Sequence, residues 1–191
     1  AQVTLSDAGR AMALKGAMIG LRGGMKYYRS GASGAADLMG DLMVELRRGE
    51  SDATQLRLAA DKLPPEGALA QKLYDLAAVY EEYDGRIAGK YQDGEDALRR
   101  SAQLCGQCGE LKDAYVFADG FDVLPRTALR LLAALGGVCR EVYVTFDLCA
   151  ADAPDAALYD PVRFSAQTLK KMCGEGGVAC EFEALADREL P

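Results

Sequence analysis

The chain has 191 residues, of which 50% are hydrophobic and 27% charged, a composition that indicates a globular protein and excludes a disordered tail or a collagen-like fibre. The absence of histidine excludes every His-based general base and His–metal site, and a net charge of -7 makes the whole chain a poor non-specific nucleic-acid binder. No apolar run reaches the length of about 18 residues that a membrane-spanning helix needs. We therefore expect a soluble, cytoplasmic protein, and the first residue, Ala1 rather than Met, favours a piece of a longer polypeptide.

The first part of the chain carries the apolar spacing of successive helices. Apolar residues at intervals of three and four predict helices over residues 6–28, 38–48, 51–62, 69–87 and 93–104. Ser6 offers an N-cap to the first of them. The acidic residues of the fourth are expected on its solvent side: Asp75, Glu81, Glu82 and Asp84. Residues 1–110 are thus predicted to form a helical subdomain.

The spacing of apolar residues changes after about residue 110. Short apolar runs rich in aromatic and branched residues predict strands over residues 114–118, 141–146 and 178–182, and helices are expected between them over residues 125–135 and 161–172. Strands that alternate with helices indicate a parallel sheet. The fold class is therefore α/β, with residues 111–191 forming a partial parallel sheet with flanking helices. Residues 114–118 are expected to form a buried strand, with residues 116–118 in the centre of the sheet.

The strongest local signal is the strand that ends in Asp119. An acidic residue at the carboxyl end of a buried parallel strand lies where P-loop ATPases hold magnesium, although an Asp that opens a turn after a strand is a common structural feature. The phosphate-binding loop G-x-x-x-x-G-K-[ST] is absent from all 191 residues. The chain alone is therefore not expected to be a P-loop ATPase.

Two further patterns have both functional and structural interpretations. Cys105 and Cys108 form a C-x-x-C pair that fits half a zinc site, a redox pair or a glycine-rich loop with two incidental thiols; no second C-x-x-C and no His complete a zinc site. Four cations on the predicted first helix fall in one sector beside its apolar face, where they either grip phosphates or form a solvated face: Lys15, Arg22, Lys26 and Arg29. Tyr27 and Tyr28 are candidates for base stacking, although Tyr28 also fits the apolar core.

Four stretches, taken in order, resemble a known family: Leu5–Lys15, Leu73–Tyr83 with Gly89–Asp96, Val116–Phe121 and Glu141–Asp147. The chain resembles a segment of the B subunit of the bacterial ATP-dependent helicase/deoxyribonuclease, the AddB type. This resemblance implies a fold similar to superfamily 1 helicases, which are P-loop helicases with a helical insertion before motif II. It also implies a role in DNA double-strand-break repair and recombination, an A-type helicase/nuclease subunit as heterodimer partner, and DNA as a ligand of the complex.

Motif II of that superfamily, typically D-E-F-Q-D, would be Asp119, Gly120, Phe121, Asp122 and Val123 here. Gly120 stands where the carboxylate that deprotonates the attacking water would be, and no Gln follows the next strand. The resemblance thus implies an inactivated motor that reads a recombination hotspot in single-stranded DNA. No cofactor is expected in this segment; ATP, Mg²⁺ and an iron–sulfur cluster are implied for the parent protein only.

Two alternatives remain open. The first is a segment of an active superfamily 1 helicase, with Asp119 on magnesium and Asp122 in place of the lost carboxylate. The second is a helical protein-interaction module unrelated to DNA. An upstream phosphate-binding loop and a downstream cysteine cluster would favour the helicase/nuclease interpretation over the module.

Overall fold

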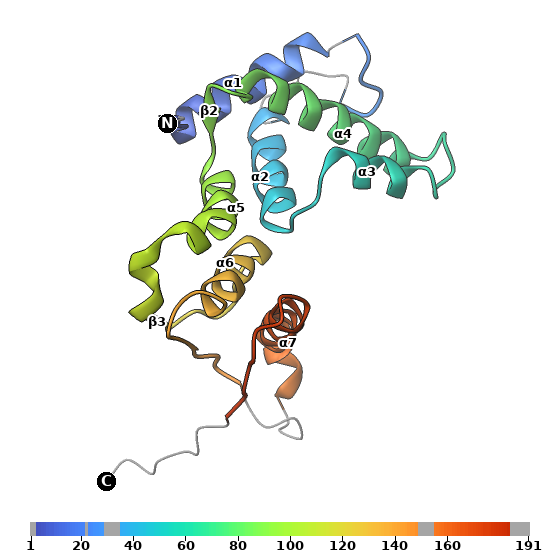
Figure 1. The fold of residues 1–191 in the computed structure, drawn as a ribbon. Helices are drawn as coiled ribbons and strands as arrows, with labels where there is room; N and C mark the ends of the chain where they lie inside the picture. The colour runs from blue at the N-terminus through green and yellow to red at the C-terminus, as the bar shows by residue number, and fades with distance from the viewer. Residues whose placement is uncertain (1–2, 22, 29–34, 149–154, 184–191) are drawn as a thin grey trace. The chain divides into compact units, whose positions relative to one another are not determined.

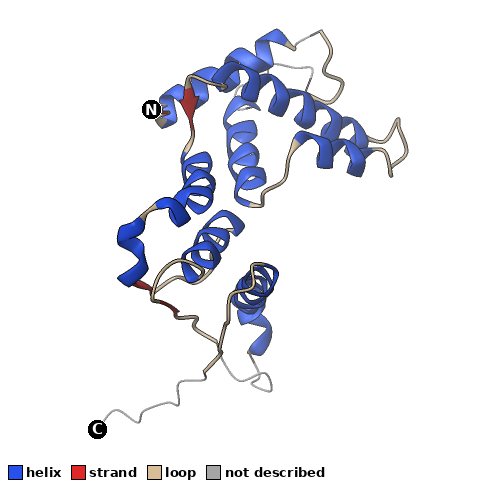
Figure 2. Ribbon diagram, viewed as in Figure 1, coloured by secondary structure: helices blue, strands red, loops and turns tan. Residues whose placement is uncertain are grey.

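The computed structural model describes residues 3–21, 23–28, 35–148 and 155–183, and the chain divides into two compact units. Unit 1 comprises Ala1–Arg100 with Pro125–Thr127, and unit 2 comprises Ser101–Leu124 with Ala128–Pro191. Figures 1 and 2 show the course of the chain and its predominance of helix. No described helix is both long enough and apolar enough to cross a membrane.

Unit 1 is built from helices and one short pair of strands. Its elements are β1 (Val3–Thr4), α1 (Asp7–Gly20), α2 (Ala35–Arg48), α3 (Ala53–Ala60), α4 (Ala68–Ile87), β2 (Tyr91–Gln92) and α5 (Gly94–Leu104), whose residues from Ser101 on belong to unit 2. Helix α4 packs against α3 and α1, and α1 packs against α2 (Figure 1). Strands β1 and β2 pair in parallel. Among the described residues, the core between these helices contains thirteen buried ones, of which Leu14, Met39 and Tyr83 are at most 2% exposed.

The predicted first helix is too long at its C-terminal end. The hydroxyl of Ser6 accepts the N–H of Gly9, as expected of an N-cap, but α1 ends at Gly20 rather than near Tyr28. The N–H of Leu21 bonds back to the carbonyl of Ala17 and closes the helix. Glycines 23 and 24 follow, and they favour a turn over further helix because a glycine backbone loses more conformational freedom on folding than any other.

Unit 2 combines a two-stranded parallel sheet with helices. Its elements are the 3₁₀ helices η1 (Cys105–Gln107) and η2 (Gly109–Asp113), β3 (Tyr115–Ala118), α6 (Arg126–Gly136), β4 (Glu141–Val144), the 3₁₀ helix η3 (Ala156–Tyr159) and α7 (Asp160–Glu175). The first two residues of α6, Arg126 and Thr127, belong to unit 1. Strand β3 pairs with β4 from Tyr115 opposite Glu141 to Ala118 opposite Val144, and α6 connects the two strands. The expected parallel α/β organisation is therefore present; Figure 2 shows its strands in red.

The prediction that residues 114–118 form a buried, central strand is wrong for the part of the chain that the structure describes. There, the sheet contains only β3 and β4, so each has one neighbour. Side chains alternate between its faces. Val116 and Val144 are half-buried on the face where α6 and α7 place the core, whereas Phe117 on the opposite face is 72% exposed. The aromatic run therefore reflects an exposed apolar face rather than a strand covered on both sides.

The expected third strand, over residues 178–182, is also wrong, since no strand forms there. The N–H of Val178 donates to the carbonyl of Cys173 at 2.8 Å and so bonds to the end of α7 instead of a neighbouring strand. The side chain of Val178 packs against the core of unit 2 and close to Gly136, at the end of α6. The apolar residue in this segment thus completes a helical core.

Candidate functional site

The carboxyl end of the β3–β4 sheet places Asp119 where the strand order predicted it. Asp119 directly follows β3, and Thr145 directly follows β4. The N–H of Thr145 donates to the carbonyl of Ala118 at 3.0 Å, and its hydroxyl donates to the Asp119 carboxylate. Asp119 is exposed, so this hydrogen bond fixes the side chain at the open edge of the sheet.

The turn after Asp119 explains why glycine occupies position 120. Gly120 has a φ of +75°, a left-handed conformation that costs residues with a Cβ roughly 1 kcal/mol or more. A Cβ at this position would meet no atom within 4 Å, so the constraint comes from the backbone and not from crowding. Phe121 and Asp122, which continue this turn, are both exposed. In this conformation a Glu at position 120 would be strained.

The described residues do not bring metal ligands together. Among residues 3–21, 23–28, 35–148 and 155–183, no group of three or more His, Cys, Asp or Glu side chains could hold a metal ion. Cys105 is buried at the start of η1 and its thiol donates to the carbonyl of Ala102, whereas Cys108 is exposed. The C-x-x-C pair therefore lies on a 3₁₀ turn between a helix and the approach to β3.

The structure describes two of the four N-terminal cations that the helical spacing had grouped, Lys15 and Lys26, and places them on different segments. Lys15 is exposed on α1, but Lys26 lies beyond the end of that helix, so a shared helical sector is wrong for this pair. Arg22 and Arg29 lie outside the described residues. Lys26 is exposed in the segment Met25–Tyr28, which follows the helix. A residue of α4 anchors this segment through hydrogen bonds.

The anchor is Asp75, which the sequence had placed on the solvent side of α4. That prediction is wrong, because Asp75 is 4% exposed. Its carboxylate accepts three successive backbone N–H groups, from Lys26 at 3.0 Å, Tyr27 at 2.7 Å and Tyr28 at 2.9 Å. Such a row of amides forms an anion-binding concavity that compensates a buried carboxylate. Tyr28 packs partly buried against the core, as its apolar spacing indicated.

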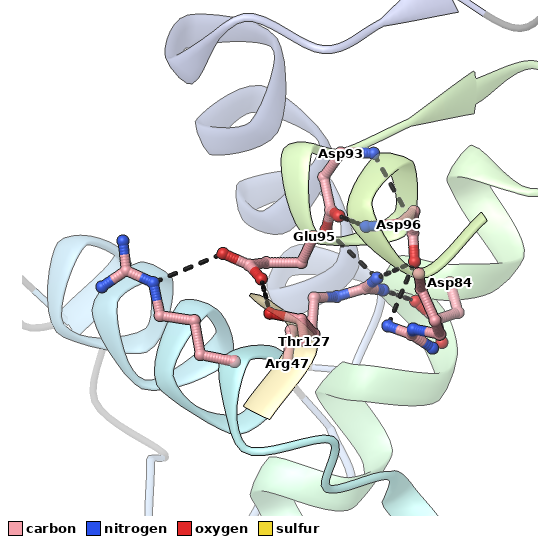
Figure 3. Close-up of polar contacts among 8 residues, drawn as sticks. Arg47, Asp84, Asp93, Glu95, Asp96 and Thr127 are labelled. Carbon is pink, nitrogen blue, oxygen red and sulfur yellow. Dashed lines mark hydrogen bonds and ion pairs between the residues drawn. The ribbon is translucent and has the colours of Figure 1, made fainter. Parts of the chain in front are cut away.

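A second polar cluster in unit 1 was not anticipated at all. Arg47, at the end of α2, is 4% exposed and contacts three carboxylates (Figure 3). Its Nη1 lies 3.1 Å from Asp93 and 2.9 Å from Asp96, and its Nη2 donates to Asp84. The guanidinium also lies 5.1 Å from the ring centroid of Tyr80. One cation therefore joins α2 to α4 and α5.

Burial and charge set the protonation behaviour of this cluster. Burial raises the pKa of Asp93 and of Asp84, although the Arg47 guanidinium opposes both shifts. Burial also raises the pKa of Tyr83 to about 12. Burial lowers the pKa of Arg47, but the surrounding carboxylates, Asp93 foremost, raise it by a larger amount. The pKa of Arg47 is therefore raised overall.

Glu95 extends the cluster on the other side of Asp93. Its carboxylate accepts a hydrogen bond from the Thr127 hydroxyl at 2.6 Å (Figure 3). The same carboxylate lies 3.4 Å from Nε of Arg48. A pocket of about 230 Å³ opens beside the cluster and is lined by charged residues of both signs, including Arg10, Arg47 and Asp93. Its cations are paired, which makes the cluster a structural junction between helices.

Two signals in the sequence could have indicated these polar residues. Asp93 and Asp96 have the spacing of a reciprocal helix cap, and their backbone and side chains do bond to each other in this way. Asp75 falls between Tyr74 and Leu76 in an otherwise apolar stretch of α4. No local pattern marks Arg47, because its partners come from two later helices.

The comparison with known families decides which one the chain represents. The model of the family described as ADDB, N-terminal matches residues 1–190. This chain belongs to that family. Three relatives of the AddB family are each named as the B subunit of an ATP-dependent helicase/deoxyribonuclease. They are those of Heliobacterium modesticaldum (33% identical over 90% of this chain), Acetivibrio thermocellus (22% over 93%) and Pelotomaculum thermopropionicum (28% over 90%).

These AddB relatives are much longer than the present chain. The matched region is 14% of the Heliobacterium protein and 16% of each of the other two. The chain thus spans about one sixth of the length of the curated relatives it matches. Membership confirms the family that the four quoted stretches indicated.

Proposed function

We propose that this chain acts as part of the B subunit of an ATP-dependent helicase/deoxyribonuclease in DNA double-strand-break repair and recombination, and that it engages DNA without hydrolysing ATP. The family match over residues 1–190 is the observation that carries this proposal. The proposal includes an A-type subunit as the partner and the cytoplasm as the location.

The arrangement of unit 2 supports a motor-like fold. Strand β3, helix α6 and strand β4 form a parallel βαβ unit with Asp119 at its carboxyl end, the edge where open α/β sheets gather their ligands. P-loop helicases place their magnesium-binding aspartate at such an edge. We therefore propose that this unit corresponds to part of a P-loop helicase-like domain, in which Asp119 would be the residue nearest to a bound Mg²⁺–ATP.

Residues at the same carboxyl end of the sheet support the proposal that ATP is not hydrolysed. Gly120 has no carboxylate to orient a water molecule, and its φ of +75° disfavours a Glu there. After β4 the chain continues as Thr145, Phe146 and Asp147, with no Gln to contact a terminal phosphate. Thr145 already uses the Asp119 carboxylate as a hydrogen-bond acceptor.

DNA contact is assigned to the N-terminal cations, with Lys15 and Lys26 exposed in unit 1. Lysine binds phosphate as a point charge, and each neutralised phosphate makes affinity depend more steeply on salt. Reading of a recombination hotspot by the parent protein is part of the same proposal. The iron–sulfur cluster implied for the parent would need ligands beyond the described part of this chain, whose cysteines form no metal-binding group.

The test combines two measurements on the chain. Single-stranded oligothymidylate should bind with salt-dependent affinity, and Lys26→Gln should lower the slope of log affinity against log salt by about 0.7, the value for one phosphate contact on a single strand. Lys62→Gln, at another exposed lysine of unit 1, is the matched control and should leave the slope unchanged. ATP turnover should stay at background with or without DNA.

Each alternative has its own outcome in this experiment. Because this segment has no phosphate-binding loop of its own, the active-motor alternative is tested in the longer protein that contains it. ATP turnover by that protein that is lost in Asp119→Asn and Asp122→Asn would establish an active motor. A chain that binds no oligonucleotide, with no turnover, would leave a protein-interaction module.

A further inference from the structure

The segment Met25–Tyr28 is bound to α4 through its backbone amides. The Asp75 carboxylate, 4% exposed on α4, accepts the N–H groups of the last three of its residues at 2.7 to 3.0 Å. Releasing the segment would leave this carboxylate buried without its donors, which is costly for a charged group. The segment is therefore tied to α4 through polar atoms that are independent of its side chains.

The side chains at both ends of the segment reinforce this attachment. Met25 is 5% exposed in the core of unit 1, and Tyr28 packs partly buried against the same core. Between these two anchors, Lys26 and Tyr27 are exposed. Tyr27 is 47% exposed, and its ring forms an edge-type contact with that of Tyr28, with centroids 4.9 Å apart and planes at 75°.

The exposed pair has the chemistry of a contact with a single-stranded nucleic acid. An aromatic face stacks on a base of any sequence, and an adjacent lysine neutralises a phosphate. The Lys26 ammonium makes no ion pair with the described residues, so its charge is not cancelled there. Because Asp75 binds only backbone amides in this segment, it fixes the position of both side chains without using either of them.

We propose that Asp75 is a positioning residue for DNA binding: it holds Met25–Tyr28 so that Lys26 contacts a phosphate and Tyr27 stacks on a neighbouring base of a single strand. This inference rests on the proposed function, which it deepens by naming the segment, the two contacts and the residue that presents them. Asp75 itself touches no DNA.

The first experiment tests the anchor by amide hydrogen exchange in the chain. In the wild type, the amides of residues 26–28 should exchange at least about tenfold more slowly than the amide of Gly23, because opening must break the bonds to Asp75. Asp75→Asn should remove most of this protection, since an amide side chain offers one accepting oxygen instead of two. Unprotected amides in the wild type would overturn the anchor without any variant.

The second experiment tests positioning by oligothymidylate affinity at several salt concentrations. Removing a negative charge favours DNA binding by simple electrostatics. Asp75→Asn should nevertheless weaken binding, by about three- to tenfold at low salt, and should lower the salt slope as much as Lys26→Gln does. Glu66→Gln, which removes an exposed carboxylate from unit 1, is the matched control and should leave affinity equal or slightly higher.

Adding Asp75→Asn to a variant that already lacks both exposed side chains separates positioning from a general loss of stability. If Asp75 acts through Lys26 and Tyr27, Asp75→Asn should have little further effect on affinity in a Lys26→Gln, Tyr27→Ala background. Additive losses, or unchanged affinity in Asp75→Asn alone, would overturn the positioning role while leaving DNA binding by the chain intact. A wild-type chain that does not bind the oligonucleotide would overturn the proposed function and this inference with it.

Discussion

The two units differ in which side chains they bury: unit 1 buries a charged residue, whereas unit 2 exposes aromatic residues. Unit 1 buries a full positive charge, Arg47, and surrounds it with carboxylates and aromatic rings, so that both terminal nitrogens of its guanidinium are paired with carboxylates. Unit 2 leaves aromatic side chains outside: Phe117 and Tyr143 stack at 5.1 Å on the open face of the sheet. The contrast shows that unit 1 depends on specific charge pairs, whereas unit 2 depends on the single sheet face that its helices cover.

The largest expected effect concerns the buried charge. Arg47→Met should destabilise the chain by about 3–5 kcal/mol, because it leaves the buried Asp93 and its neighbours without their cation. Arg48→Met is the control, since that side chain is 49% exposed and its ion pairs are worth less than about 1 kcal/mol. Urea unfolding followed by circular dichroism measures both. Equal losses in the two variants would show that the cluster is not the junction of unit 1.

Unit 2 should respond to its covered face and not to its open one. Leu129 is 1% exposed in the core beside α7, and Leu129→Ala should cost about 2–5 kcal/mol through the cavity it creates. Phe117→Ala should cost less than about 1.5 kcal/mol, since it removes only the stacking on Tyr143. The same unfolding experiment compares them. A larger loss for Phe117→Ala would mean that the open face is covered in solution.

Periodicity predicted most helices and the parallel β3–β4 pair because local spacing determines which residues face a core. Helices α2, α4 and α6 lie within a few residues of their predicted bounds. The position of Asp119 beside the end of β4 also followed from parallel strand order. These are properties that a short window of sequence contains.

The failures arose where a distant residue decides the structure. The spacing of apolar residues predicted that the first helix would extend to Tyr28. The amides of residues 26–28 instead bond to Asp75, nearly fifty positions later in the chain. Arg47 similarly depends on carboxylates from α4 and α5. The long-range bonds of Asp75 and Arg47 leave no periodic trace in the sequence. The failure at Val178 has a local cause: the end of α7, five residues earlier, takes the N–H that a strand would need.

A smaller effect is expected at the turn that follows β3. Gly120→Ala should destabilise unit 2 by about 1 kcal/mol, because φ at this position is +75°. Gly109→Ala is the control: a Cβ there also meets no atom within 4 Å, but the φ of Gly109 is not left-handed. Gly120→Asn should lose less than the alanine variant, since Asn tolerates this region. Equal stability of all three variants would contradict the conformational reason for the glycine.

The smallest effect is a pH dependence inside the Arg47 cluster. Asp93 is 4% exposed in unit 1, and burial raises the pKa of its carboxyl although Arg47 and the N–H of Asp96 oppose the shift. The folded state therefore binds a proton more readily than the unfolded state. The contribution of protonated Asp93 to stability is fully present below the unfolded pKa and is lost as pH rises through the raised folded pKa.

Asp93→Asn isolates this dependence because Asn cannot titrate and still offers an oxygen to the Asp96 N–H. The unfolding free energy of the wild type minus that of Asp93→Asn should rise as pH is lowered from 7 to 4. Asp52→Asn, which also keeps a capping oxygen but at an exposed position before α3, is the matched control for loss of a carboxylate. If the difference for Asp93 instead grew toward pH 7, the attraction of Arg47 would outweigh burial, and the interior of unit 1 would stabilise the ionised carboxylate.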